Sequence, residues 1–173
     1  MENILANKLV SARKMAGLSL QGLADRLENE VSKQALNKYE QGKMKPNSMG
    51  IMAIANALNV PVSYFYAIPA VKVALEDVEF RKNATKLSKL DDFSIREKVK
   101  DNFERYFELE EILHLNEKND YFVFDRIIKS PKDAEDAANQ LRNEWNLGYD
   151  PIPDVVEMLE DKGYKVIDID APE

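Results

Sequence analysis

Apolar side chains in the first 66 residues recur at helical spacing, in short runs separated by turn residues. The first run consists of Ile4, Leu5, Leu9, Val10 and Ala12. Gly17 follows this run where a left-handed helix end is typical, and Ser19 then offers its hydroxyl to the free amides of a second helix over 20–27. The pattern therefore predicts two short helices joined by a turn at Gly17.

A second turn, over 28–31, precedes a third helix, KQALNKYE, which Ser32 is placed to cap. The inward face of this helix consists of Ala35, Leu36 and Tyr39, and the outward face of Lys33, Gln34, Asn37 and Lys38. An apolar helix from Ser48 and a last helical turn over 61–66 follow. Residues 1–66 are therefore predicted to form a domain of five short helices with a helix-turn-helix arrangement.

The pattern changes after residue 66. Residues 67–93 contain Pro69 and alternate between apolar and polar side chains, which predicts an extended linker. Ser94 and Glu97 then form an S-x-x-E capping box, typical of a helix start. The apolar stripe that follows consists of Val99, Phe103, Tyr106, Phe107, Ile112 and Leu113. We therefore expect a long amphipathic helix and its connection over 94–129.

Residues 130–173 contain the signals of two more helices. The first opens at Ser130 and ends before Gly148, and the second begins at Pro153. The segment YKVIDID, residues 164–170, is predicted to form a short strand. The predicted fold class is thus mainly α: a helix-turn-helix domain followed by a helical region that ends in one strand.

Composition narrows the functional classes. The 173 residues include no cysteine and one histidine, so neither a disulfide framework nor a thiolate zinc site can form. The first residues lack the order of a secretory signal, and no apolar run approaches the roughly 18 residues needed to span a bilayer. We expect a cytoplasmic protein with no membrane role and no cofactor.

Charge is distributed unevenly along the chain, whose net charge is −7. Residues 1–66 carry 8 Lys and Arg against 5 Asp and Glu, whereas residues 67–173 carry 16 against 26. A basic excess is the electrostatic footprint expected of a nucleic-acid-binding domain. Alternatively, the small excess is incidental and the acidic half is an ordinary solvated surface.

The outward face of the third helix has the chemistry to read DNA. Gln34 and Asn37 carry amides that can pair bidentately with an adenine edge, and Lys33 and Lys38 can reach guanine acceptors. The predicted phosphate contacts outside this helix are Arg13, Lys43 and Lys45. Polar residues of this kind also occur on ordinary solvated helices, so the case depends on the ordered set of helices and turns.

The segments SLQGLADRL, VSKQALNKYEQGKMKP and MGIMAIANALNVPVSYFY together resemble the phage-repressor and Xre family of helix-turn-helix regulators, which have a lambda-repressor-like fold. The likeness covers 4–66 and implies DNA contacts at Ser32, Lys33, Gln34, Asn37 and Lys38, with Ser32 assigned here to phosphate. Further matches to the family pattern are Tyr39, Glu40, Gly42 and Pro46. Where many members have a phosphate-binding glutamine, this sequence has Leu20, with Gln21 one position later.

The segment AANQLRNEWNLGYDPIPDVVEMLEDKGYKV, within residues 130–170, resembles the opening of the ImmA/IrrE family of zinc-dependent peptidase-like domains. The likeness rests on Leu141, Arg142, Trp145, Leu147, Gly148, Pro151, Ile152, Leu159 and Gly163. That family's chemistry uses an H-E-x-x-H helix, which is missing from this sequence. His114 has no second histidine to complete a zinc site, so we assign it no role.

We therefore predict a sequence-specific regulator of transcription that binds a double-stranded DNA operator, acts as a repressor and forms a homodimer. No catalytic or metal-binding residue is predicted, and the chain is not expected to be an enzyme. Two alternatives stay open. The chain can be the DNA-binding fragment of a regulator-metallopeptidase, or an antitoxin-like protein whose acidic C-terminal half binds a protein partner. The aromatic residues over 121–127 and the paired carboxylates of the acidic half are interpreted as core and solvated surface.

Overall fold

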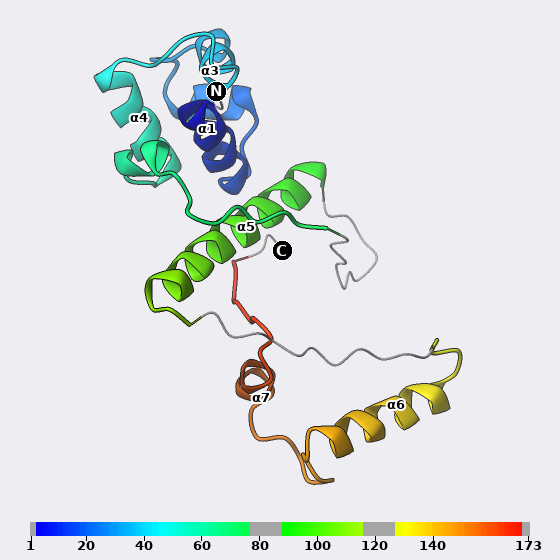
Figure 1. Cartoon of the computed structure of the whole chain (residues 1–173). Helices are drawn as coiled ribbons and strands as arrows, with labels where there is room; N and C mark the ends of the chain where they lie inside the picture. The colour runs from blue at the N-terminus through cyan, green and yellow to red at the C-terminus, as the bar shows by residue number, and fades with distance from the viewer. Residues whose placement is uncertain (1–2, 77–87, 116–126, 171–173) are drawn as a thin grey trace. The chain divides into compact units, whose positions relative to one another are not determined.

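A computed structural model describes residues 3–76, 88–115 and 127–170 of the protein (Figure 1). Contacts between backbone positions divide the chain into two units. The first comprises Met1–Leu115 with Ile169–Glu173, and the second Asn116–Asp168. Every regular element in the described residues is helical, and none of these helices is both long and apolar enough to cross a membrane.

The first unit begins with four α-helices and a short 3-10 helix (Figure 1). Their bounds are α1 Ile4–Met15, α2 Leu20–Arg26, α3 Lys33–Glu40, α4 Ser48–Leu58 and η1 Val62–Tyr66. The predicted last helical turn is thus a 3-10 helix, whose first bond joins the Tyr64 amide to the Pro61 carbonyl, 3.0 Å away. Short segments of this kind commonly form 3-10 helices, in which each hydrogen bond joins residues three positions apart.

The predicted turns and caps of this region are confirmed. Gly17 has φ +65°, the left-handed conformation expected after α1. The Ser19 hydroxyl accepts from the Gly22 amide at 2.9 Å, and the Ser32 hydroxyl accepts from the Ala35 amide at 3.2 Å. Local hydrogen bonds therefore fix where α2 and α3 begin.

One apolar core joins these elements. Its largest fully buried side chains are Leu23, Leu36, Ile54 and Phe65. Each comes from a different element, so α2, α3, α4 and η1 all bury an apolar side chain in the same cluster. Removal of this apolar surface from water stabilises the domain.

The long helix α5, Lys89–Ile112, begins before the predicted position. Ser88 and Asp91 form its capping box, with the Asp91 amide 3.1 Å from the Ser88 hydroxyl. The predicted box of Ser94 and Glu97 is wrong, because Ser94 lies inside the helix and its hydroxyl donates to the Met15 carbonyl at 2.8 Å. The predicted linker, 67–93, is therefore too long: its last five residues, 89–93, belong to α5, and its residues 77–87 lie outside the described residues.

The apolar stripe of α5 is only partly covered. Val99, Phe103 and Tyr106 are half-buried, and the Phe103 ring stacks on that of Phe107 at 5.8 Å between centroids. Exposed apolar side chains near the end of the helix are Leu109, Ile112 and Leu113. The final part of α5 thus leaves apolar surface uncovered by the described residues.

The second unit contains α6, Pro131–Glu144, and α7, Val155–Asp161. Both predicted helices are confirmed, with Ser130 as the cap of α6. The predicted strand over 164–170 does not form, because within the described part of the chain this segment has no ladder partner. Residues 121–126 of the predicted aromatic segment lie outside the described residues.

Candidate nucleic-acid interface

The orientation of α3 is set by one buried side chain. Leu36 is 2% exposed and lies in the core, while Ala35 and Tyr39 are half-buried beside it. The opposite face of α3 is exposed and consists of Lys33, Gln34, Asn37 and Lys38. All four predicted base-reading residues therefore project from the domain surface on one helix.

Ser32 lies at the start of this face. Its hydroxyl oxygen accepts from the Ala35 amide, and its own O–H remains able to donate, since a hydroxyl both accepts and donates. Ser32 is exposed, so it can cap α3 and donate to a DNA phosphate at the same time. The two roles do not compete.

Asn37 has a neighbour that the sequence reasoning missed. The Gln41 amide Nε2 donates to Asn37 Oδ1 at 3.1 Å, and both side chains are exposed. This bond favours one orientation of the Asn37 carboxamide. The signal in the sequence was the i, i+4 spacing of the two residues, which places them on one helix face.

The contacts of the Arg13 side chain differ from those expected of its predicted role in phosphate binding. Its Nε and Nη2 donate to the two carboxylate oxygens of Glu40 at 2.6 and 2.8 Å, and its Nη1 donates to the Leu18 carbonyl at 2.8 Å. The Arg13 and Glu40 side chains are only 12% and 11% exposed. Arg13 therefore joins α1 to the end of α3 inside the domain, and it does not belong to the proposed interface.

The turn after α3 carries two of the predicted phosphate contacts. Lys43 and Lys45 are both exposed there. Gly42 has φ +68°, and a Cβ added to it would lie 2.4 Å from Asn3 Nδ2. The positive φ favours glycine here, and a side chain at this position would displace that of Asn3, whose Oδ1 caps α1. The two lysines follow this turn.

The start of α2 reflects the departure from the family pattern. Leu20 packs against the core, and the Gln21 amide donates to the Asp25 carboxylate at 2.8 Å. The Gln21 side chain is therefore hydrogen-bonded to a residue one turn later in α2 and does not lie at the first backbone amides of this helix. A phosphate bound there would have to use the backbone amides.

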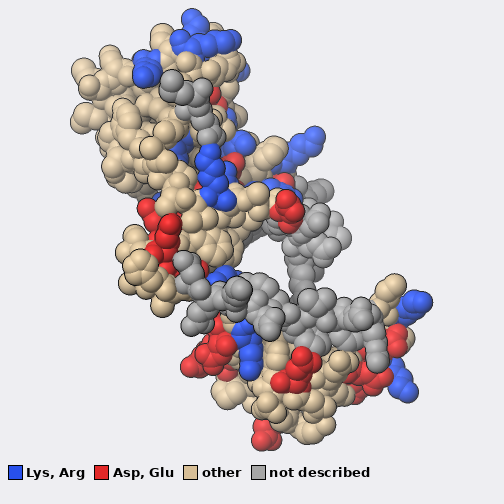
Figure 2. Space-filling model, viewed as in Figure 1, with Lys and Arg blue, Asp and Glu red and all other residues tan. Residues whose placement is uncertain are grey.

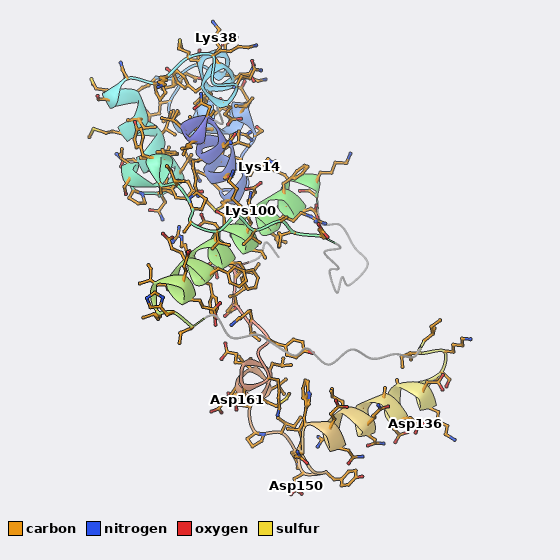
Figure 3. All side chains as sticks on the ribbon, viewed as in Figure 1. Lys14, Lys38, Lys100, Asp136, Asp150 and Asp161 are labelled. Atoms are coloured by element: carbon orange, nitrogen blue, oxygen red, sulfur yellow. The ribbon has the colours of Figure 1, made fainter. Side chains whose placement is uncertain are left out.

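Positive charge gathers at the α3 end of the domain. Figure 2 shows Lys and Arg side chains there, around the position where Figure 3 labels Lys38. By contrast, Lys14 lies at the other end of the domain, and its ammonium is 3.5 Å from the Glu97 carboxylate. The exposed cations on and after α3 thus lie beside the amide-bearing helix face, as a phosphate backbone would require.

The described residues contain no group of three or more His, Cys, Asp and Glu placed to hold a metal ion. His114 is exposed just after α5, with φ +55°. It is thus a helix-end residue in the described structure.

The model of the helix-turn-helix family matches residues 9–65. Comparisons with curated proteins and with solved structures give no match. The matched range contains α2, α3, α4 and η1 complete, together with most of α1. Residues 9–65 therefore form a helix-turn-helix domain, and the exposed face of α3 belongs to its second motif helix.

Proposed function

We propose that this protein is a sequence-specific double-stranded DNA-binding regulator of transcription, in which α3 enters the major groove. The observation that supports this most is the exposed face of α3 in a domain that matches the helix-turn-helix family. An α-helix fits the major groove, and there amide and cationic side chains can distinguish all four base pairs. A helix with this outward chemistry, held from beneath by Leu36, meets both requirements.

The residues divide into two roles. The proposed base-contacting residues are Lys33, Gln34, Asn37 and Lys38. The proposed phosphate contacts are Ser32, Lys43 and Lys45. Phosphate contacts fix the position of the protein on the duplex but carry no sequence information, so only the first group should determine which operator is bound.

We also propose that the protein acts as a repressor and as a homodimer. The eight residues of α3 can read only a few base pairs, and two-fold symmetry doubles the contacts on a pseudo-palindromic operator. Leu109, Ile112 and Leu113 supply exposed apolar surface on α5 that a second copy can cover. This surface belongs to the same unit as the DNA-binding domain.

The test is selection of binding sites from a random duplex library by the full chain, followed by affinity measurements. Gln34→Ala should lower discrimination at one base pair by roughly 1 to 3 kcal/mol. Asn56→Ala, an exposed amide residue on α4, is the matched control and should leave the preference unchanged. An unenriched library, or equal preferences for wild type and Gln34→Ala, would contradict the proposal.

A second proposal concerns a protein partner of the acidic C-terminal half. None of the described residues of the second unit is buried, and its exposed apolar side chains include Ile127, Tyr149, Val155 and Val156. A separate hollow of about 330 Å³ in the same unit is lined by Trp145 and by carboxylates, among them Asp154 and Glu157. Exposed apolar surface with an acidic rim is typical of a protein-binding site. Quantitative affinity capture with the full chain should recover one partner in stoichiometric amount. The Val155→Asp variant should fail to capture this partner.

A further inference from the structure

The two amide side chains on the exposed face of α3 differ in their surroundings. The Gln34 carboxamide makes no hydrogen bond to any described residue. By contrast, Asn37 Oδ1 accepts from Gln41 Nε2 at 3.1 Å. Lys38, which Figure 3 labels, follows Asn37 and marks this part of α3. The two amides therefore differ in their freedom to rotate before DNA is bound.

The backbone fixes Gln41 one helical turn beyond Asn37. Gln41 is the C-cap of α3, and its backbone amide donates to the Asn37 carbonyl at 3.0 Å. Gly42 follows with φ +68°, so the chain leaves the helix directly after Gln41. A recognition helix contacts base edges mainly through its N-terminal residues, and Gln41 lies at the opposite end of α3. Gln41 is therefore placed to act on Asn37 and not to read a base itself.

The bond from Gln41 determines which polar atom of Asn37 is left free. A carboxamide has an acceptor oxygen on one side and a donor NH2 group on the other. Because Oδ1 accepts from Gln41, Nδ2 and its two hydrogens form the free end of this exposed side chain, with no partner among the described residues. In this orientation Asn37 offers a hydrogen-bond donor to DNA.

The four bases differ in what they offer such a donor in the major groove. Adenine and guanine present the acceptor N7 and thymine presents the acceptor O4, whereas cytosine presents only the donor N4. Adenine also carries the donor N6, which the second lone pair of Asn37 Oδ1 can accept. To read cytosine, Asn37 must turn its carboxamide over, and this breaks the bond with Gln41. The bond thus favours adenine and acts against cytosine.

We propose that Gln41 is a positioning residue, which acts through Asn37 and makes the protein reject cytosine at one base pair of its operator. This role rests on the proposed function, in which Asn37 contacts a base. The net contribution of one hydrogen bond between neutral groups corresponds to a factor of about two to ten in an equilibrium constant. Gln41 should therefore contribute a factor of this size to the discrimination between adenine and cytosine.

The test measures the affinity of the full chain for four operator duplexes, which differ only at the base pair whose preference Asn37→Ala changes. Gln41→Met keeps the length of the side chain without its donor, and it should lower the ratio of adenine to cytosine affinity about two- to tenfold. Gln41→Glu should lower this ratio further, because a carboxylate can only accept and Asn37 must turn Nδ2 toward it. The added negative charge weakens binding to all four duplexes alike, so the ratio is the readout.

Gln21→Met is the matched control, because Gln21 Nε2 makes an i, i+4 bond of the same kind on α2, to Asp25 Oδ1 at 2.8 Å. This variant should leave the ratio unchanged. In an Asn37→Ala background, Gln41→Met should have no further effect on the ratio, which separates action through Asn37 from a direct contact of Gln41 with a base.

Three results would overturn the role of Gln41 while the proposed function stands: base preferences unchanged in Asn37→Ala, an unchanged ratio in Gln41→Met, or an effect of Gln41→Met that persists without Asn37. A wild-type chain that selects no operator would instead refute the proposed function, and the role of Gln41 with it.

Discussion

Replacing Arg13 with alanine separates the role seen in the structure from the role predicted from the sequence. The guanidinium makes two bonds to Glu40 and one to the Leu18 carbonyl, between side chains that are almost fully buried. Removing one partner of a buried, hydrogen-bonded ion pair costs about 3 to 5 kcal/mol, because the other charge stays buried and unpaired. Arg13 and Glu40 each keep slight exposure, so we expect about 3 kcal/mol for Arg13→Ala.

Urea denaturation, followed by circular dichroism, measures this loss as a lower midpoint at an unchanged slope. Lys33→Ala, at an exposed position of α3, is the control and should change the free energy of unfolding by less than about 0.5 kcal/mol. Arg13→Lys should recover little stability, because an ammonium cannot reproduce the two-pronged contact with the carboxylate.

The opposite pattern would refute this reasoning. If Arg13→Ala is as stable as the wild type, and its DNA affinity falls with a shallower dependence on salt, then Arg13 contacts phosphate and the pair with Glu40 contributes nothing. A double-mutant cycle with Glu40→Ala adds a second check. The two losses should be far from additive, because either variant alone breaks the same pair.

Gly42→Ala should destabilise the domain more than Gly17→Ala. Both glycines have positive φ, so alanine at either position costs about 1 kcal/mol. Only at Gly42 would the new Cβ also meet a close neighbour, and the midpoints of urea denaturation will rank the two variants. Leu109→Asp combined with Ile112→Asp should shift the full chain from dimer toward monomer in sedimentation equilibrium without lowering its helix content. A wild-type chain that stays monomeric at high concentration would refute the proposed interface. The dialysed protein should contain no stoichiometric zinc by elemental analysis and cleave no co-expressed candidate peptide substrate, since one histidine and no cysteine leave only carboxylates as further ligands; zinc together with cleavage would contradict this.

Local signals in the sequence were sufficient for the helix-turn-helix region. The caps at Ser19 and Ser32 and the left-handed glycine at Gly17 depend on neighbouring residues alone, and all three are confirmed. The start of α5 was missed because two S-x-x-acid patterns occur close together, at Ser88 and Ser94. A contact with α1, distant in sequence, determines which serine caps the helix and which is buried.

Contacts between residues that are distant in sequence also explain the other differences between prediction and structure. The partner of Arg13 is Glu40, 27 residues away, and nothing in the spacing shows that the two meet. Likewise, alternation over 164–170 is compatible with a strand, but a strand also needs a neighbouring backbone, which the pattern of one segment cannot supply. The outward face of α3 was predictable because Leu36 and its neighbours fix the direction of a short helix.

The central claim is that α3 reads DNA from the major groove, and dimethyl sulfate protection of the selected operator tests it. The reagent methylates guanine N7 in the major groove and adenine N3 in the minor groove. The account predicts protection of guanine N7 in two patches about one helical turn apart, as expected for a dimer, and loss of base selectivity at one position in each patch with Gln34→Ala. Protection confined to adenine N3, or a wild-type footprint that leaves every guanine N7 reactive, would contradict it.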